Sequence, residues 1–239
     1  MSWLRTFSPP FANALERAVD AARTTERPVA VFDADNTLWS RDIGEAFLRW
    51  LIAGRLLTGL DYTTDIYGEY ERRVDADRSS AYAWAVSAMA GLKLEDVQTW
   101  SRQLAYAWPN YRPVMRTLVR GLTEEGFEVW IVSASNAWSV AAAARYMDIE
   151  PERVLGITCR VDSGIITPEV LQPVTCNQGK VDAIRQTIGV RPLLAFGDSL
   201  GDLEMLEHVG QPMVVLDATV ASTPLSRIAT ERNWPVQQV

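Results

Sequence analysis

Histidine is almost absent from this chain, which has one imidazole side chain in 239 residues. Ser-His-Asp triads, Cys-His dyads and zinc clusters all need imidazole groups, so these chemistries are excluded. The single histidine, His208, lies just before Gly210 near the end of an expected helix, which indicates a structural role at a helix C-terminus. Any catalysis must therefore use carboxylates, lysine, hydroxyl groups or a bound metal ion.

Cysteine and long apolar segments are also scarce. Cys159 and Cys176 provide neither a disulfide framework nor a metal-ligand spacing, which suits a reducing compartment. No apolar segment reaches the ~18 residues of a membrane span, and the N-terminus lacks the basic and apolar regions of a signal peptide. We therefore expect a cytoplasmic protein that does not act on a membrane.

Basic residues are fewer than acidic residues. The chain has 23 Lys and Arg against 30 Asp and Glu, which gives a net charge of −7 and a pI near 4.9. No positive surplus exists to neutralise the phosphates of a nucleic acid or of an anionic membrane, so neither is an expected partner. Individual basic residues can still bind one small anion. The sequence does not indicate an oligomeric state.

What the chain does contain is an apolar run that stops at two carboxylates. Residues 29–32 have the length and branching of a buried strand, and Asp33 and Asp35 follow it directly. Ligands of open α/β sheets bind at the carboxyl ends of the strands, so this acidic pair is better placed for chemistry than for stability. In the alternative interpretation the two aspartates are turn residues that cap a helix.

The rest of the pattern alternates strands with helices. Helices are expected over residues 11–23, 114–124, 137–147, 180–188 and 203–208, and strands over 29–32, 129–132, 154–158, 193–196 and 213–216. A small hairpin is expected around Ser163 and Gly164. This alternation predicts an α/β fold with a Rossmann-like, doubly wound parallel sheet.

One block without convincing strands interrupts the alternation. Between residues 41 and 111 apolar positions recur at spacings of three and four, which indicates helices. The block has about 70 residues, too many for a simple crossover, so it is predicted to be an inserted small helical cap domain. The predicted division is a Rossmann-like core of residues 1–39 and 112–239, with the cap over 40–111.

Polar residues follow three of the expected strands. They are Asp33 and Asp35, then Ser133, then Asp198 with Asp202. If the strands are parallel neighbours, these residues meet at one edge, and a hard cation such as Mg²⁺ would relieve the repulsion among the carboxylates. A phosphate group could then bind to the cation, to Ser133, to helix N-terminal amides and to Lys180.

Four short motifs stand in order along the chain. They are D-A-D-N-T-L at residues 33–38, V-W-I-V-S ending at Ser133, Gly179-Lys180, and G-D-S-L-G-D at residues 197–202. Together they resemble the motifs of the haloacid dehalogenase superfamily of phosphohydrolases, over about residues 29–217. The resemblance implies a phosphatase rather than a dehalogenase, because Asp35 can supply the proton that an alkoxide needs and a halide does not.

The resemblance also implies a role for each acidic residue of the motifs. Asp33 would be the nucleophile that forms an aspartyl-phosphate, and Asp35 would be the general acid and base. Mg²⁺ would be held by the Asp33 carboxylate, the Asp35 carbonyl group and Asp198, with Asp202 as a further ligand or close by. Asp202 could instead be an acidic residue in the first turn of a helix.

The remaining motif residues are expected to bind phosphate. By the same resemblance Ser133, the backbone N–H of Ala134 and Lys180 would hold the phosphoryl oxygens. Taken singly, Ser133 could be a helix cap and Lys180 a solvated charge. Two other functions stay open: a phosphotransferase that uses an alcohol as acceptor, and a non-catalytic module that binds a phosphorylated metabolite.

The predicted cap resembles the phosphoserine phosphatase-like branch, which acts on small substrates. In phosphoserine phosphatases a glutamate nine positions after the nucleophile faces the substrate amine, and here that position is Asp42, one methylene shorter. An arginine of the cap binds the substrate carboxylate in those enzymes. The candidates in this chain are Arg49, Arg55, Arg72 and Arg73. The expected substrate is a small phosphate ester that carries an amine and is phosphoserine-like.

A second resemblance, to bacterial phosphocholine phosphatases, depends on D-A-D-N-T-L-W followed by Asp42 and Glu45. In those enzymes an acid at the Glu45 position helps to hold the quaternary ammonium group. Trp39, beside the first motif, is then a candidate for a cation–π contact with the substrate. Further candidates in the cap are Trp50, Trp84, Trp100 and Trp108. In the alternative interpretation these tryptophans belong to the core.

Overall fold

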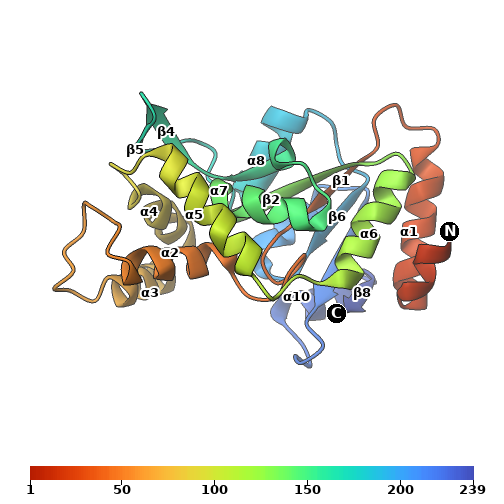
Figure 1. The fold of residues 1–239 in the computed structure, drawn as a ribbon. Helices are drawn as coiled ribbons and strands as arrows, with labels where there is room; N and C mark the ends of the chain where they lie inside the picture. Colours follow the sequence, from red (N-terminus) through yellow and green to blue (C-terminus); the bar gives the residue numbers. More distant parts are fainter.

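The computed structural model describes residues 1–239, and a six-stranded sheet lies at its centre (Figure 1). The strands are β1 (Val29–Phe32), β2 (Glu128–Asn136), β3 (Val154–Ile157), β6 (Leu194–Gly197), β7 (Gln211–Leu216) and β8 (Val236–Gln238). Their order is β3-β2-β1-β6-β7-β8, and every neighbouring pair is parallel. The predicted Rossmann-like α/β fold is confirmed.

Helices cover both faces of this sheet. The first face carries α1 (Pro9–Ala22), α6 (Pro113–Glu124) and α7 (Ala137–Ala144), and the second carries α8 (Gln178–Ala183), α9 (Leu203–Glu207) and α10 (Pro224–Glu231). Along β1, Ala30 and Phe32 pack toward the first face, whereas Val29 and Val31 pack toward the second. Because the strand is buried on both faces, its sequence is apolar throughout instead of alternating.

Between β1 and α6 the chain forms helices without a regular strand. They are α2 (Ile43–Ala53), α3 (Ile66–Ala76), α4 (Arg78–Ser87) and α5 (Leu94–Ala107). In Figure 1 these helices lie to one side of the sheet, next to the hairpin of β4 (Cys159–Asp162) and β5 (Ile165–Val170). We call them the helical insertion. The domain boundaries at residues 40 and 111 stay a prediction.

The helical insertion shares its apolar cluster with the hairpin. Phe47 and Val97 of the insertion belong to the same buried cluster as Ile157 and Ile166, which come from β3 and β5. Backbone hydrogen bonds join the two segments as well: Gly91 N–H donates to the Ile166 carbonyl at 2.8 Å, and Ile166 N–H donates to the Leu92 carbonyl at 2.9 Å. The hairpin therefore anchors the insertion at one end.

Several element boundaries differ from the sequence prediction. Strand β2 continues to Asn136, so Ser133 and Ser135 belong to its end rather than to a following loop. Helix α8 passes into a π-helical turn at Ile184–Ile188. The sequence prediction also missed α10, β8 and a 3-10 helix at Ser2–Thr6. The missed strand is three residues long, which is too short for hydrophobic periodicity to reveal.

The scarce residues occupy structural positions. His208 is the C-cap residue of α9, as predicted. Cys159 and Cys176 are buried free thiols. None of the helices combines the length and the hydropathy that a bilayer span requires.

Candidate active site

The polar residues that follow β1, β2 and β6 meet at the carboxyl edge of the sheet. Since β2, β1 and β6 are adjacent and parallel, their ends open into one cavity of about 350 Å³, which the helical insertion encloses from the other side. The motif residues that line this cavity are Asp33, Asp35, Ser133, Ala134, Lys180, Asp198 and Asp202. All seven predicted motif residues therefore share one site.

Asp33 and Lys180 form a buried ion pair at the end of β1. Lys180 Nζ donates to Asp33 Oδ1 at 2.6 Å and to Asp202 Oδ1 at 2.6 Å, and its side chain is 2% exposed. Burial raises the pKa of Asp33 to about 7, and Asp202 adds to the rise, while Lys180 opposes it. Burial lowers the pKa of Lys180, but the two carboxylates outweigh this and hold it above its ordinary value. The lysine therefore stays charged and favours the ionised form of Asp33.

The residue before Lys180 explains how α8 can start so close to the site. A Cβ atom on Gly179 would lie 1.8 Å from the carbonyl oxygen of Val174, so only glycine fits there. The preceding loop is tied to β2, because the Thr175 hydroxyl donates to the carbonyl oxygen of Ser133. Gly179 thus allows the close backbone approach that places Lys180.

Asp35 is fixed by hydrogen bonds to both of its carboxylate oxygens. Oδ1 accepts from Trp39 Nε1 and from the backbone N–H of Ile43, each at 2.7 Å, and Oδ2 accepts from Ser135 Oγ at 2.6 Å. Burial raises the pKa of Asp35 to about 7, and Asp42 adds to the rise, whereas the three hydrogen bonds lower it. A carboxyl group with such a pKa can gain and lose a proton near neutrality, as a general acid and base must.

Three carboxylates could hold a metal ion. Oxygen atoms of Asp33, Asp198 and Asp202 lie within 4.8 Å of one another. Burial, with Asp202 and Asp33 adding to the effect, raises the pKa of Asp198 well above its ordinary value. Three carboxylates against the single ammonium of Lys180 leave an excess of two negative charges, which a divalent cation would balance. Clustered carboxylate oxygens are the ligands that Mg²⁺ prefers, so these residues fit the predicted ion.

Asp202 differs from the other two carboxylates because its own oxygens are already engaged. Oδ1 accepts from Lys180, and Oδ2 accepts from the backbone N–H groups of Asp198 at 3.2 Å and Ser199 at 3.1 Å. These bonds shape the loop that carries Asp198. Asp33 and Asp198 are therefore the better candidates for direct ligands, with Asp202 as the residue that orients them.

On the side of the helical insertion, Asp42 and Glu45 line the cavity. Asp42 is the N-cap of α2, and its Oδ1 accepts from the backbone N–H of Glu45 at 2.7 Å. Burial raises the pKa of Asp42 to about 6. Glu45 is occupied by other groups, since it accepts from the Tyr67 hydroxyl and from Arg49 Nε at 3.0 Å. Asp42 is also engaged within the protein, because its Oδ1 accepts from the Ser135 hydroxyl at 3.4 Å as well.

None of the tryptophans that are candidates for a cation–π contact lines the cavity. Trp39 is fully buried beneath the catalytic loop, edge-on to Tyr111 with 6.1 Å between ring centroids, and it does not reach the cavity. Its N–H group faces Asp35 instead. The tryptophans at positions 50, 84, 100 and 108 do not line the cavity either. The aromatic side chains of the lining are Tyr70 and Tyr82.

The four candidate arginines also lie outside the cavity lining. Their partners are Glu45 for Arg49, Tyr62 for Arg55, and Glu69 for both Arg72 and Arg73. Each is thus engaged within the helical insertion by an ion pair or a stacked ring. The candidate set must be corrected, because none of these four side chains lines the cavity.

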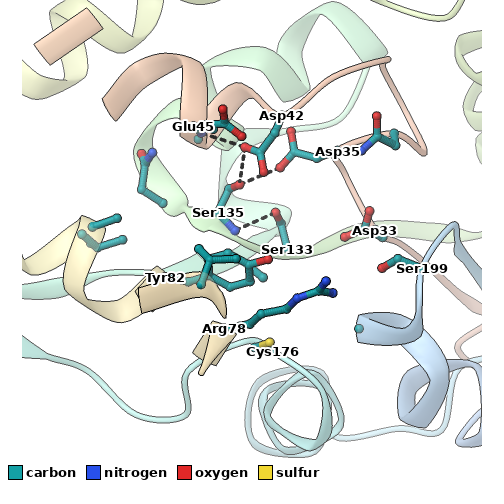
Figure 2. Close-up of a pocket in the computed structure, with 18 of the residues that line it drawn as sticks. Asp33, Asp35, Asp42, Glu45, Arg78, Tyr82, Ser133, Ser135, Cys176 and Ser199 are labelled. Carbon is teal, nitrogen blue, oxygen red and sulfur yellow. Dashed lines mark hydrogen bonds between the residues drawn. The ribbon is translucent and has the colours of Figure 1, made fainter. Parts of the chain in front are cut away.

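The arginine that does line the cavity is Arg78, at the start of α4. Figure 2 shows its side chain reaching toward the side where Asp33 and Ser199 lie. The Arg78 side chain is exposed, and its guanidinium makes no hydrogen bond or ion pair with the protein. Nothing in the sequence distinguishes Arg78 from its neighbours, because the face that α4 turns to the cavity depends on how Ala81 and Val86 pack.

Comparisons with known proteins agree with this arrangement. A family model described as haloacid dehalogenase-like hydrolase matches residues 30–207. A histidinol-phosphatase of Neisseria meningitidis serogroup C is 24% identical over 222 residues, which cover 87% of this chain and 97% of that protein. A phosphorylcholine phosphatase of Pseudomonas aeruginosa is 25% identical, over 82% of this chain and 75% of that protein. The phosphoserine phosphatase SerB1 of Mycobacterium tuberculosis is 24% identical, over 96% and 80%.

Solved structures share the fold. A Bordetella pertussis protein described as of unknown function has a TM-score of 0.75 at 21% identity, over 89% of this chain and 98% of that one. A substrate-bound phosphoserine phosphatase has a TM-score of 0.55 at 16% identity, over 85% and 90%. At these identities the likeness concerns the fold alone.

Proposed function

Because the chain belongs to the family of haloacid dehalogenase-like hydrolases, we propose that it hydrolyses a small, amine-bearing phosphate monoester through an aspartyl-phosphate on Asp33. As a member with phosphatase-named relatives along most of its length, it is a phosphatase. The observation that carries the proposed mechanism is the pairing of Asp33 with Lys180, beside Asp35, at the bottom of one cavity.

In the proposed reaction an oxygen of Asp33 attacks phosphorus, and the bond from phosphorus to the ester oxygen breaks. Asp35 gives its proton to the departing alkoxide, so the alcohol leaves neutral. A water molecule then attacks the phosphorus of the aspartyl-phosphate and loses a proton to Asp35. This step frees inorganic phosphate and restores both carboxyl groups. The pKa of about 7 supports a carboxyl group that alternates between acid and base.

The phosphoryl group needs donors around its other oxygens. We assign this task to the Ser133 hydroxyl, the backbone N–H of Ala134 and Lys180, all of which line the cavity. Lys180 also offsets the charge of Asp33, so that an anionic phosphate can approach an anionic nucleophile.

Asp33, the carbonyl oxygen of Asp35 and Asp198 are the groups that would hold Mg²⁺. When bound there, the ion would compensate the negative charge that the carboxylates and the phosphoryl oxygens accumulate. The support is the grouped carboxylates and the two uncompensated charges of the site. Asp202 keeps Lys180 and the loop of Asp198 in position.

The preference for an amine depends on Asp42. Its carboxylate faces the cavity, and a cationic nitrogen beside it would recover the electrostatic cost of its burial. Histidinol, choline and serine, the alcohols in the names of three relatives, each carry a nitrogen that is cationic at neutral pH. Phosphocholine stays the alternative substrate, because Tyr70 and Tyr82 line the cavity and tyrosine rings can also contact a quaternary ammonium group.

Replacement of the nucleophile tests the proposal. Asp33→Asn should lower the hydrolysis of p-nitrophenyl phosphate by at least about 10³-fold, because an amide does not form the intermediate. Asp20→Asn, an exposed change in α1, is the matched control and should keep full activity. Circular dichroism should show both variants folded. An Asp33→Asn enzyme as active as the wild type would contradict the mechanism.

A substrate screen separates the other possibilities. Phosphate release should be compared for phosphoserine, phosphoethanolamine, phosphocholine and sugar phosphates. A clear preference for sugar phosphates would contradict the proposal that the substrate carries an amine. A wild-type protein that binds one of these esters and releases phosphate from none of them would be a binding module. A phosphotransferase would transfer phosphate to an added alcohol, which mass spectrometry of the products would detect.

A further inference from the structure

We propose that Trp39 is a positioning residue: its indole N–H and the first backbone N–H of α2 hold one oxygen of Asp35, so that the other oxygen faces the leaving group. This inference builds on the proposed function, in which Asp35 is the general acid and base. Trp39 itself does not line the cavity and acts only through Asp35.

The two oxygens of Asp35 have different surroundings. Oδ1 accepts from Trp39 Nε1 and from Ile43 N–H, each at 2.7 Å, and both groups can only donate. Two donors occupy both lone-pair directions of this oxygen. Oδ2 has one protein partner, the Ser135 hydroxyl at 2.6 Å, which can donate or accept. Oδ2 is therefore the oxygen that can exchange a proton with a ligand in the cavity.

Trp39 is held rigidly enough to fix Asp35. Its ring is 0% exposed and meets Tyr111 edge-on. The Tyr111 hydroxyl in turn donates to the Ala105 carbonyl at 2.8 Å, which ties that ring to the end of α5. Asp35 is half-buried and borders an open cavity, so without these donors its carboxylate could rotate about the Cβ–Cγ bond. The surrounding core thus limits the orientation of the acid.

The second donor connects Asp35 to the helical insertion. Ile43 is the first residue of α2, and its N–H is one of the helix N-terminal groups that has no partner within the helix. Asp42, directly before it, caps the same helix and faces the cavity. The start of α2 therefore fixes two carboxylates together: it holds Oδ1 of Asp35, which leaves Oδ2 for proton exchange, and it carries the proposed amine-binding Asp42.

A leaving-group comparison distinguishes this role from a general loss of structure. An alkoxide needs a proton as it departs, whereas p-nitrophenolate is a stable anion that needs little help. Trp39→Phe keeps the aromatic packing and removes the N–H. Asp35 is also the base of the second step, which is the same for every ester, so the quantity to compare is kcat/KM, which reports the step in which the leaving group departs. We expect kcat/KM for the preferred alkyl phosphate to fall by about 10- to 100-fold and kcat/KM for p-nitrophenyl phosphate by less than about 3-fold.

Trp108→Phe is the matched control. Trp108 is also buried, belongs to the same apolar cluster, and has an indole N–H without an acceptor. The same substitution there should leave both activities unchanged. Asp35→Asn is the reference variant, because it removes the acid itself. It should show the same selectivity for the alkyl ester over p-nitrophenyl phosphate, with a larger loss of activity.

Ile43→Pro removes the other donor and serves if Trp39→Phe does not fold. Proline is favoured in the first turn of a helix, and the extended backbone of Asp42 suits a residue before proline. This variant should show the same selective loss for the alkyl ester. Equal losses of kcat/KM on the two substrates, or no loss on the alkyl ester, would overturn the role of Trp39 while Asp35→Asn stays selective. If the wild type hydrolyses neither ester, the proposed function itself fails.

Discussion

Arg78 is the side chain whose position says most about the substrate. It lines the cavity without an ion-pair partner, whereas Lys180, the other cation of the lining, is paired with two carboxylates. A guanidinium free of protein partners suits a second anionic group on the ligand. With Asp42 facing the same cavity, the two residues would together recognise a zwitterion such as an amino acid.

Substitution of Arg78 should therefore discriminate between two esters. In Arg78→Ala we expect KM for phosphoserine to rise by about 10- to 100-fold, since a charge-assisted hydrogen bond contributes roughly 1.5–3 kcal/mol. KM for phosphoethanolamine, which lacks the carboxylate, should change by less than about 3-fold. Steady-state kinetics measure both, and Arg55→Ala, outside the cavity, is the control. An equal rise for both esters would mean that Arg78 binds the phosphoryl group they share.

The start of α8 decides where Lys180 lies. Gly179→Ala would bring a methyl group onto the Val174 carbonyl oxygen, so the helix must shift. We expect unfolding in urea to show a loss of about 1–3 kcal/mol, with a fall in kcat as Lys180 moves. Gly59→Ala, where nothing lies within 4 Å, should leave stability and kcat nearly unchanged. A stable and fully active Gly179→Ala would show that the helix accommodates the methyl group without moving Lys180.

The helices and strands also differ in how well the sequence alone predicts their place in the site. Strand β1 and the residues after it were predictable, because a doubly buried strand is apolar throughout and its polar end stands out. Around helix α4 the sequence has no comparable change from apolar to polar residues, since Arg78 is one of several charged residues near the start of the helix. The position of Trp39 next to a motif makes it a candidate ligand contact from the sequence. Tertiary packing, which the sequence pattern does not reveal, buries its ring in the core instead.

A bound cation would join β1 to the loop after β6 and so stabilise the fold. We expect Mg²⁺ at about 100 times its Kd to add roughly 2.7 kcal/mol, a rise in Tm of about 5–10 °C. Thermal unfolding in EDTA and in excess Mg²⁺ measures this without an activity assay. The rise should be larger at pH 8 than at pH 5, because protons compete for Asp33, whose pKa is about 7. Asp198→Asn should abolish the rise, and an identical Tm in EDTA and Mg²⁺ would exclude the site.

The apolar cluster that the helical insertion shares with the hairpin limits which segments could be swapped between this enzyme and its relatives to make a folded chimaera. A segment cut at residues 40 and 111 would take Phe47 and Val97 with it and leave Ile157 and Ile166 uncovered on the donor. A chimaera with a new substrate range would therefore need two transplanted segments, the insertion and the strands 154–170. Recombination within this lineage would be constrained in the same way.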